Sequence, residues 1–466
     1  MYQGLYAFMS ATKERRDLLL SQREPQFDVA LDKQIAEAAD DFTRIALKAK
    51  AAKDYFLLVG PPGTGKTSCA LKKMVETFYK EEGAQILLLS YTNRAVDEIC
   101  KALSSIRPEV DFIRVGSELS CDENYRDHLI ENELATCMRR TEVCERINRC
   151  RILVGTVASI SGKPELFRLK HFDVAIVDEA TQILEPQLLG ILCAKGENGK
   201  EGVGKFILIG DHKQLPAVVL QNTEQSEVYD EALSAVGLKN LKDSLFERLY
   251  RTARQHTDAH RTYDMLCRQG RMHPEVALFA NQAFYEGRLL PVGLPHQLED
   301  SGNINRLSFY PSQPEPMGSS AKTNHSEAKI AARLAATVYK EHSEAFDASR
   351  TLGIITPYRS QIALIKKEIE VLGISELNQI LIDTVERFQG SERDVIIYSF
   401  CVNYPYQLKF LSNLTEEDGI LIDRKLNVAL TRARKQMLLT GVPTLLERNP
   451  LYKSLLKLIE SLRNIA

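Results

Sequence analysis

With 466 residues, of which 44% are hydrophobic, the chain is long enough for two or three domains of ordinary size. Its 60 lysines and arginines nearly balance 62 aspartates and glutamates, which excludes a strong overall attraction to phosphate, so any nucleic-acid track must be a local basic surface. The sequence shows neither a signal-peptide pattern nor an apolar run near the roughly 18 residues of a bilayer span, so we expect an intracellular protein without a membrane partner, cytoplasmic or, in a eukaryote, nuclear.

The first half of the chain alternates short apolar runs with longer helical stretches. Such runs are typical of parallel strands buried on both faces, and the stretches between them have the length of crossover helices. This alternation predicts βα units in a doubly wound sheet, which we assign to residues 31–265, after a helical lead-in at 1–30. The predicted strands are 56–59, 86–89, 152–154, 174–177 and 206–209, and the predicted helices include 66–79 and 95–103.

Residues 102–149 interrupt this alternation with a charged segment that we interpret as a helical insertion. It is either a nucleic-acid clamp or a solvated helical arm, and we favour the clamp. Cys121, Cys137, Cys144 and Cys150 lie in or beside it. Four thiolates can hold an iron–sulfur cluster, but this spacing matches no compact ligand motif, so we interpret them as ordinary thiols of a reducing compartment.

The second half repeats the alternation after a stretch rich in Gly, Pro and Ser at 293–322. A helix is predicted after Asn324, and strands are predicted at 352–355, 380–384 and 395–399. We assign 266–466 to this second lobe and place the boundary within 255–275, because 241–249 still has the pattern of a helix on the first lobe. The sequence therefore predicts an α/β protein of two lobes, each a mainly parallel sheet with helices on both faces.

A phosphate-binding loop is predicted at Gly60-Pro61-Pro62-Gly63-Thr64-Gly65-Lys66-Thr67, which fits G-x-x-x-x-G-K-[ST] between a predicted strand and a predicted helix. Glycines let backbone N–H groups close around phosphate, and the helix N-terminus adds partial positive charge. Lys66 would reach the outer phosphates, and the Thr67 hydroxyl would ligate Mg²⁺. We expect all eight residues to contact the nucleotide.

Two carboxylates, Asp178 and Glu179, end the predicted strand 174–177. A nucleotide hydrolase needs one acid to hold Mg²⁺ and another to orient or deprotonate water, so we assign Asp178 to the metal and Glu179 to the water. An Asp-Glu pair by itself is also common at a solvated strand end, and its position downstream of the phosphate loop favours the catalytic interpretation. After the next strand, Gln214 is a candidate sensor of the γ-phosphate, although Gly210-Asp211 could be only a turn.

These motifs, together with others that follow in order, resemble the superfamily 1 helicases of the up-frameshift type. The resemblance covers about 30 to 445 and implies two tandem RecA-like lobes of the P-loop NTPase class. The motifs are Gly60–Thr67, Ser90-Tyr91-Thr92-Asn93-Arg94-Ala95-Val96-Asp97, Gly155-Thr156, Asp178-Glu179-Ala180-Thr181-Gln182, Gly210–Pro216, Ser244-Leu245-Phe246-Glu247-Arg248-Leu249, Arg271-Met272-His273-Pro274, Ile355-Thr356-Pro357-Tyr358, Thr384-Val385-Glu386-Arg387-Phe388-Gln389-Gly390-Ser391-Glu392 and Leu426-Asn427-Val428-Ala429-Leu430-Thr431-Arg432-Ala433-Arg434.

The resemblance implies a role for each motif. Arg271 and Arg432 would stabilise the charge on the γ-phosphate of ATP, so that hydrolysis depends on closure of the two lobes around a cleft that holds the nucleotide. Gly390 and Glu392 would bind the ribose side of ATP, and Gln34 would recognise adenine. Strand-facing positions bind phosphates without reading bases, although each threonine among them could instead be a helix cap. They are Thr92, Asn93, Thr156, Pro357, Tyr358 and Thr384.

The chain departs from the family pattern at two places. Members usually carry a stalk and a small β-barrel ahead of the phosphate loop, and 59 residues leave no room for the barrel here, so we expect either a fragment that lacks N-terminal domains or a stripped core. Members also have Tyr in Gln-Tyr-Arg-Met-His-Pro, where this chain has Gly270 between Gln269 and Arg271. The ring that would stack on the nucleotide base is therefore absent.

Three functions remain to be separated. The first is an ATP-dependent helicase or translocase on single-stranded DNA or RNA, with 5′ to 3′ movement implied by the resemblance. The second is a nucleic-acid-gated ATPase that clamps a strand without travelling, inside a larger repair, defence or nuclease assembly. The third is a scaffold with a dead ATP site, which the intact set of candidate catalytic residues disfavours. That set is Lys66, Asp178, Glu179, Gln214, Arg271 and Arg432.

Overall fold

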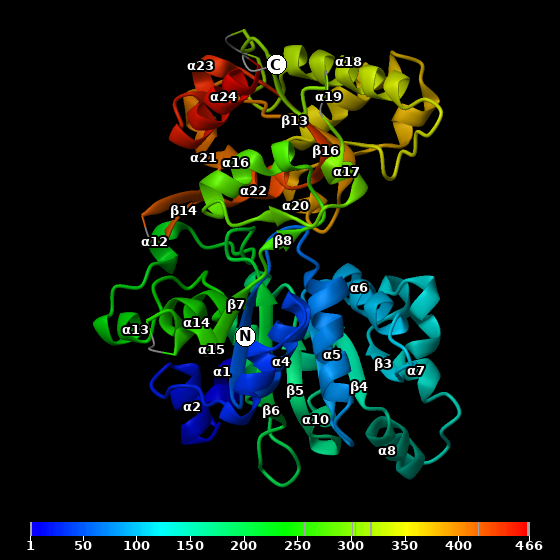
Figure 1. Cartoon of the computed structure of the whole chain (residues 1–466), viewed down its shortest axis with the longest axis vertical. Coiled ribbons are helices and arrows are strands. Elements are labelled where there is room, and N and C mark those ends of the chain that lie inside the picture. The colour runs from blue at the N-terminus through cyan, green and yellow to red at the C-terminus, as the bar shows by residue number, and fades with distance from the viewer. Residues whose placement is uncertain are drawn as a thin grey trace. The chain divides into compact units, whose positions relative to one another are not determined.

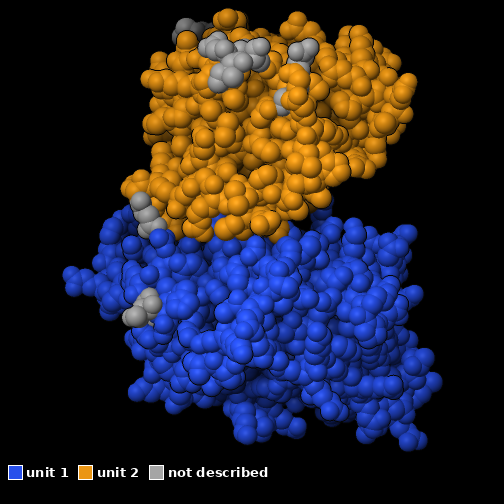
Figure 2. Space-filling view, in the orientation of Figure 1, with its two compact units in different colours: residues 1–61, 65–212, 216–266 blue, residues 62–64, 213–215, 267–466 orange. Residues whose placement is uncertain are grey.

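The computed structural model describes residues 2–255, 258–300, 302, 304–316, 319–417 and 419–463. They form two compact units, each drawn in one colour in Figure 2. Unit 1 comprises residues 1–61, 65–212 and 216–266, and unit 2 comprises 62–64, 213–215 and 267–466. Within the described ranges, no helix is long and apolar enough to cross a membrane.

Unit 1 is built on a seven-stranded sheet in which every neighbouring pair is parallel (Figure 1). The strand order is β3-β4-β2-β5-β6-β1-β7. All five strands that the sequence predicts here are present, each slightly longer than predicted, because their apolar runs are buried on both faces. The strands are β1 (Tyr55–Val59), β2 (Ile86–Ser90), β3 (Phe112–Val115), β4 (Ile152–Thr156), β5 (Phe172–Val177), β6 (Val203–Gly210) and β7 (Tyr263–Met265).

Helices cover both faces of this sheet. In β1, Tyr55, Leu57 and Val59 join one core cluster, and Phe56 and Leu58 join another on the opposite face. The first cluster is covered by α2 (Lys13–Leu19), α9 (Val157–Ser161), α10 (Glu165–Leu169), α11 (Glu185–Leu192) and α14 (Leu245–Ala253). The second is covered by α4 (Asp41–Ala51), η2 (Lys66–Leu71), α5 (Lys72–Tyr79) and α6 (Asn93–Ser104).

The shorter helices of unit 1 lie at its periphery and include the segment before the phosphate loop. Helix α1 packs on α11, where Gly4 is required because a Cβ there would lie 1.9 Å from the Pro186 carbonyl oxygen. These helices are α1 (Tyr2–Met9), α3 (Asp32–Ala36), α7 (Ile130–Glu133), α8 (Arg140–Arg149), α12 (Thr223–Ser226), α13 (Glu231–Ala235) and α15 (Ala259–Thr262).

The predicted helical insertion at 102–149 needs a correction. It contains β3, which pairs in parallel with β4 at the edge of the sheet, and only short helices follow it. The strand escapes sequence patterning because Arg114 sits in its middle. In the structure Arg114 is buried, and its guanidinium lies 2.9 Å from the Asp97 carboxylate, which compensates the buried charge.

Unit 2 is built on a five-stranded sheet, again with only parallel neighbours, in the order β10-β16-β13-β11-β12. The strand predicted at 352–355 has these bounds in the structure, and the other two predicted strands are present with shifted ends. The sheet strands are β10 (Leu307–Pro311), β11 (Leu352–Ile355), β12 (Leu381–Asp383), β13 (Arg393–Ser399) and β16 (Ala433–Gly441). Two small sheets pair β8 (Arg268–Gln269) with β9 (Leu290–Pro291), and β14 (Leu414–Glu417) with β15 (Ile420–Asp423).

Helices flank this second sheet as well. One core cluster joins α18 (His325–Glu341) and α19 (Arg359–Glu370) to Leu352, Ile354 and Val395. Other helices contact the strands of the same sheet. Helices α16 (Pro274–Phe284) and α22 (Arg424–Leu430) contact β16, and α24 (Pro450–Arg463) contacts β10. The fold-class prediction of two α/β lobes with mainly parallel sheets is confirmed. The remaining helices are α17 (Pro295–Leu298), η6 (Ser375–Gln379), α20 (Val385–Phe388), η7 (Pro405–Gln407), α21 (Leu408–Leu411) and α23 (Pro443–Leu446).

Candidate functional site

In unit 1 the phosphate loop leaves β1 beside the end of β6, where the Gly60 N–H donates to the Gly210 carbonyl at 2.9 Å. A Cβ at position 60 would lie 2.1 Å from Cγ of Lys66, so glycine leaves room for the Lys66 side chain in this conformation. Gly65 has a left-handed φ of 76° and starts the helix that begins at Lys66. The Lys66 ammonium donates to the Gly60 carbonyl at 2.8 Å, so this side chain folds back over its own loop.

Asp178 lies at the carboxyl end of β5 and is 1% exposed. Burial, together with the neighbouring Glu179, raises the pKa of Asp178 to about 6, although the Thr67 hydrogen bond and the charge of Lys66 oppose this shift. The Thr67 hydroxyl donates to the Asp178 carboxylate across 111 residues of sequence. The fold thus brings together the three residues Lys66, Thr67 and Asp178 that the sequence assigns to phosphate and metal.

Glu179 is the next residue and has a positive φ of 53°, which is uncommon for a residue with a side chain. This conformation turns the chain out of β5, and the Glu179 carboxylate accepts a hydrogen bond from Gln182 at 2.9 Å. Both residues belong to the motif Asp178–Gln182. Gln182 therefore holds the carboxylate that the sequence assigns to water, a contact that the motif alone does not specify.

Thr67 and Asp178 also pass a test of chemical fit for Mg²⁺. A hydroxyl and a carboxylate supply the hard oxygen ligands that Mg²⁺ prefers. Burial and the neighbouring charge of Glu179 disfavour the ionised form of Asp178 and raise its pKa, and a divalent cation would stabilise that form. In the part of the chain that the structure describes, no group of three or more His, Cys, Asp or Glu side chains is arranged to hold a metal, and the Asp178 site has one carboxylate and one hydroxyl.

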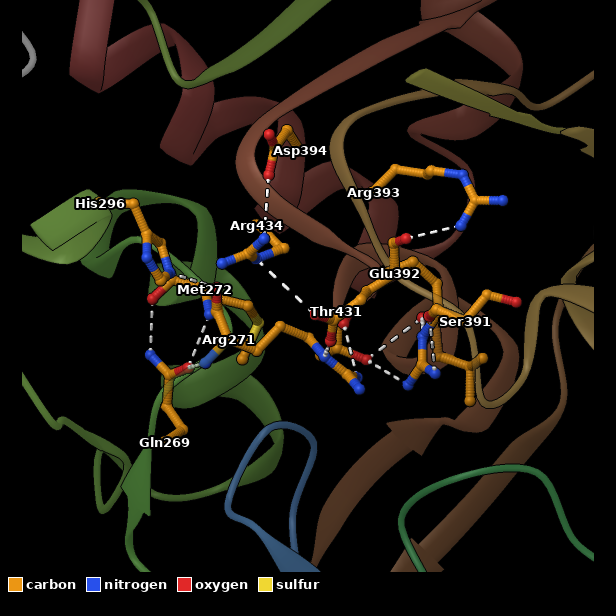
Figure 3. A network of polar contacts seen from close by, with 12 residues as sticks. Gln269, Arg271, Met272, His296, Ser391, Glu392, Arg393, Asp394, Thr431 and Arg434 are labelled. Carbon is orange, nitrogen blue, oxygen red and sulfur yellow. Dashed lines mark hydrogen bonds and ion pairs between the residues drawn. The ribbon is translucent and has the colours of Figure 1, made fainter. Parts of the chain in front are cut away.

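In unit 2 the candidate arginines are already bonded to protein groups, and Figure 3 shows the surroundings of Arg271. Arg271 Nε lies 2.5 Å from the Glu392 carboxylate, and its Nη1 donates to the Thr431 carbonyl at 3.3 Å. Burial alone would raise the pKa of Glu392, but the charges of Arg271 and Arg434 outweigh burial and lower it. Two residues that the sequence assigns to different parts of the nucleotide are therefore paired with each other.

Arg432 is 2% exposed and is held by oxygens of its own unit. Its Nε donates to the Val428 carbonyl at 3.0 Å, and its Nη2 lies 3.3 Å from the side-chain oxygen of Gln214, which belongs to the loop segment 213–215 of unit 2. Arg432 and Gln214, both predicted to sense the γ-phosphate, are thus brought together. Gly390 has a φ of 77°, which explains the glycine in that motif.

The turn that carries Arg271 is fixed by three buried amide and imidazole side chains, of which Figure 3 labels Gln269 and His296. Gln269 Oε1 accepts the N–H groups of Arg271 and Met272 at 3.0 and 2.7 Å. His296 Nε2 donates to the Arg271 carbonyl at 2.8 Å, and Gln297 Nε2 donates to the carbonyls of Gln269 and Met272, both at 2.9 Å. His296 and Gln297 come from α17, outside every recognised motif, and no sequence signal pointed to them.

The predicted strand-facing residues lie at the carboxyl edges of the two sheets. In unit 1, Thr92 follows β2 and Thr156 ends the adjacent β4. Both threonines also cap helices, since their hydroxyls accept the N–H groups of Ala95 and Ser159. Asn93 is the first residue of α6. The two threonines therefore have the capping role that the sequence left open. Their contact with a nucleic-acid strand stays a prediction.

The remaining predicted residues are divided between the two units. In unit 2, Pro357 and Tyr358 follow β11, and Thr384 follows the adjacent β12. In unit 1, Gln34 lies exposed on α3, which packs on α4, and α4 in turn contacts the start of the phosphate-loop helix. Among the cysteines, Cys121 and Cys150 are buried, and Cys137 and Cys144 are half-buried. Burial raises the pKa of the Cys150 thiol to about 11.

Two protein-family models, both described as AAA domain, match residues 36–222 in two overlapping segments and residues 241–444. The "DNA replication ATP-dependent helicase/nuclease DNA2" of Bos taurus is 28% identical over 504 residues, covering 97% of this chain and 42% of that protein. Its namesake in Homo sapiens is 29% identical, covering 95% and 42%. The chain therefore spans less than half the length of these relatives.

Among solved structures, the "Complex structure of Arterivirus nonstructural protein 10 (helicase) with DNA" is 16% identical and covers 86% of this chain and 62% of that one. Its TM-score of 0.41 is too low to support an inference. Together the two family models span most of the residues that carry the motifs. The chain belongs to the superfamily 1 helicases of the up-frameshift type.

Proposed function

We propose that the chain is an ATP-dependent motor that moves along single-stranded nucleic acid, with 5′ to 3′ polarity, and that unwinding follows from this movement. The observation that carries the proposal is the contact between Thr67 and the buried Asp178 carboxylate beside Lys66. A phosphate loop followed by an acid that is short of positive charge is the arrangement that binds Mg²⁺ and a nucleoside triphosphate. The helicase names of the relatives support the same activity.

The chemistry can be divided among this chain's own residues. Lys66 would leave the Gly60 carbonyl and bind the outer phosphates, and Thr67 and Asp178 would hold Mg²⁺. The cation, when bound, supplies positive charge to the phosphate oxygens during transfer. Glu179 would orient the attacking water and accept its proton, a role compatible with its bond to Gln182.

Arg271 and Arg432 would then stabilise negative charge on the γ-phosphate. Each arginine must leave its present partner to bind phosphate. Arg271 must leave Glu392, and Arg432 must leave Gln214. Because unit 1 supplies Lys66, Asp178 and Glu179 and unit 2 supplies the arginines, hydrolysis would need both units. We propose that binding of a nucleic-acid strand favours the state in which residues of both units act on the same nucleotide. This dependence couples hydrolysis to movement.

The test compares ATP hydrolysis with and without oligonucleotides of single-stranded DNA and of RNA. We expect strong stimulation by at least one of them, and Lys66→Ala should abolish turnover in every condition. Equal turnover with and without a strand would contradict the coupling. Translocation is then measured on oligonucleotides blocked at one end, and a block at the 3′ end should stop the motor. Strand-stimulated hydrolysis without any movement would instead favour a clamping ATPase.

A further inference from the structure

A pair of stacked tyrosines lies on the loop after β13. Tyr404 and Tyr406 flank Pro405 at the start of η7, and their ring centroids are 5.7 Å apart with 13° between the ring planes. Tyr406 is 54% exposed, and Phe410 of the following helix α21 is 63% exposed. Aromatic side chains are costly to leave in water, so a group of them at the surface indicates a contact area.

The turn beneath the two rings is held by buried amides and does not depend on the rings for its order. Gln407 is 2% exposed, its Oε1 accepts the N–H groups of Asn403 and Tyr404, both at 2.9 Å, and its Nε2 donates to the Ala321 carbonyl at 2.6 Å. Asn403 in turn donates to the Thr323 carbonyl at 2.8 Å. A ligand that meets these rings would therefore meet a preorganised surface.

The tyrosine pair lies at the same sheet edge as the predicted strand contacts of unit 2. Strands β11 and β13 are adjacent and parallel, so the loops after them emerge together. Pro357 and Tyr358 follow β11, and the tyrosine pair follows β13. Gln407 joins the two loops directly, because its Nε2 also lies 3.2 Å from the Tyr358 hydroxyl. In open α/β sheets ligands bind at this carboxyl edge.

The chemistry of this surface suits the bases of a single strand. Residues 400–415 contain Lys409 and no aspartate or glutamate, and Lys409 and Arg359 are both exposed. A surface that carries both flat neutral rings and exposed cations matches the alternation of bases and phosphates in an unpaired strand. A duplex hides its base faces, and therefore offers much less to such rings.

We propose that Tyr406, backed by Tyr404, is a stacking platform for one base of the bound strand, adjoining the phosphate contacts predicted at Pro357 and Tyr358. This inference rests on the proposed function, since it assumes that a strand runs along this edge. Stacking tolerates every base, so the platform holds the strand without sequence preference, as a stepping motor requires. The residues lie outside all the motifs that define the family resemblance.

The first test measures affinity for a 20-nucleotide single strand at several salt concentrations. Tyr406→Ala should weaken binding about fivefold to 150-fold, the effect expected for loss of one stacked base, whereas Tyr406→Phe should stay near wild type. The slope of affinity against salt should not change, because no phosphate contact is lost. Lys409→Ala, by contrast, should reduce that slope. Wild-type affinity in Tyr406→Ala, or a changed slope, would overturn the platform.

The second test uses fluorescence and does not depend on the alanine variant being folded. The chain has no tryptophan, so Tyr406→Trp introduces a single indole. Its emission should be quenched by an oligonucleotide and not by an abasic strand of the same length, which offers phosphates without bases. Tyr2→Trp, at an 89% exposed position of α1, serves as the matched control and should show no quenching. Equal quenching by the abasic strand, or none by either, would overturn base stacking.

The two proposals fail in distinguishable ways. If the wild-type protein binds no single strand and its ATP hydrolysis is not stimulated, the proposed function fails. The stacking platform alone fails if the wild type binds a single strand and is stimulated by it, but Tyr406→Ala binds with wild-type affinity and Tyr406→Trp is quenched equally by the abasic strand.

Discussion

In unit 1, Asp178 is buried and its pKa is raised to about 6, whereas in unit 2 Glu392 is paired with two arginines and its pKa is lowered. The charge of Lys66 does not outweigh burial at Asp178, whereas the two arginines outweigh burial at Glu392. A magnesium ion that binds Asp178 would stabilise a buried carboxylate whose ionised form is unfavourable. A phosphate that binds Arg271 must compete with Glu392. We therefore propose that Asp178 contributes mainly to affinity for the nucleotide and that Arg271 affects mainly the rate.

Glu179→Gln should separate binding from chemistry most strongly. The variant keeps the hydrogen bond to Gln182 but loses the base, so turnover should fall on the order of 10²- to 10⁴-fold. Binding of ATP with Mg²⁺, measured by calorimetry, should stay close to wild type. The control is Glu165→Gln at an exposed position of α10, which should leave turnover unchanged. A large loss of ATP affinity in Glu179→Gln would place this carboxylate among the binding groups instead.

Asp178→Asn should abolish turnover and yet stabilise the protein at pH 8. A carboxyl whose folded pKa is raised contributes stability that is fully present below its ordinary pKa of 3.8 and is lost as the pH rises through about 6. Asparagine removes this loss, which is at most about 3 kcal/mol and corresponds to a few degrees in melting temperature. The gain should shrink at pH 5. A variant less stable than wild type at pH 8 would show that Asp178 is not short of positive charge.

His296→Ala should lower the rate of ATP hydrolysis because it loosens the turn that carries Arg271, and it removes no contact with the nucleotide. Loss of the hydrogen bond to the Arg271 carbonyl frees the turn, so we expect kcat to fall about tenfold with KM unchanged. In an Arg271→Ala background the same change should have no further effect. His296→Gln, which keeps a donor, should recover part of the rate, and His342→Ala, at the C-cap of α18, is the control. Additive losses in the double variant would separate His296 from Arg271.

The sequence was most informative where chemistry restricts residue type. The glycines, Lys66 and Thr67 of the phosphate loop are required locally. The carboxyl end of β5 lies at the same edge of the parallel sheet, with β6 between β5 and β1. Strands made of continuous apolar residues, such as β11, were also predictable. Contacts that depend on tertiary structure were not predictable. The buried Arg114 hides the apolar pattern of β3, and no pattern in α17 indicates that His296 bonds Arg271.

The smallest expected effect concerns Gly270, where family members have a tyrosine. A Cβ at this position would lie 3.2 Å from Cδ1 of Leu294, so a side chain fits only if Leu294, which is 40% exposed, moves by a few tenths of an ångström. A ring stacked on the nucleotide base contributes about 0.5–1.5 kcal/mol, or roughly threefold to tenfold in affinity. We expect Gly270→Tyr to lower KM for ATP and for GTP by similar factors near the lower end of this range. The maximal rate should hardly change, because a base contact present in both ground and transition states gives uniform binding. Unchanged constants for both nucleotides would mean that the position does not reach the base, and loss of folding would mean that Leu294 cannot yield, so that glycine serves the packing of this turn.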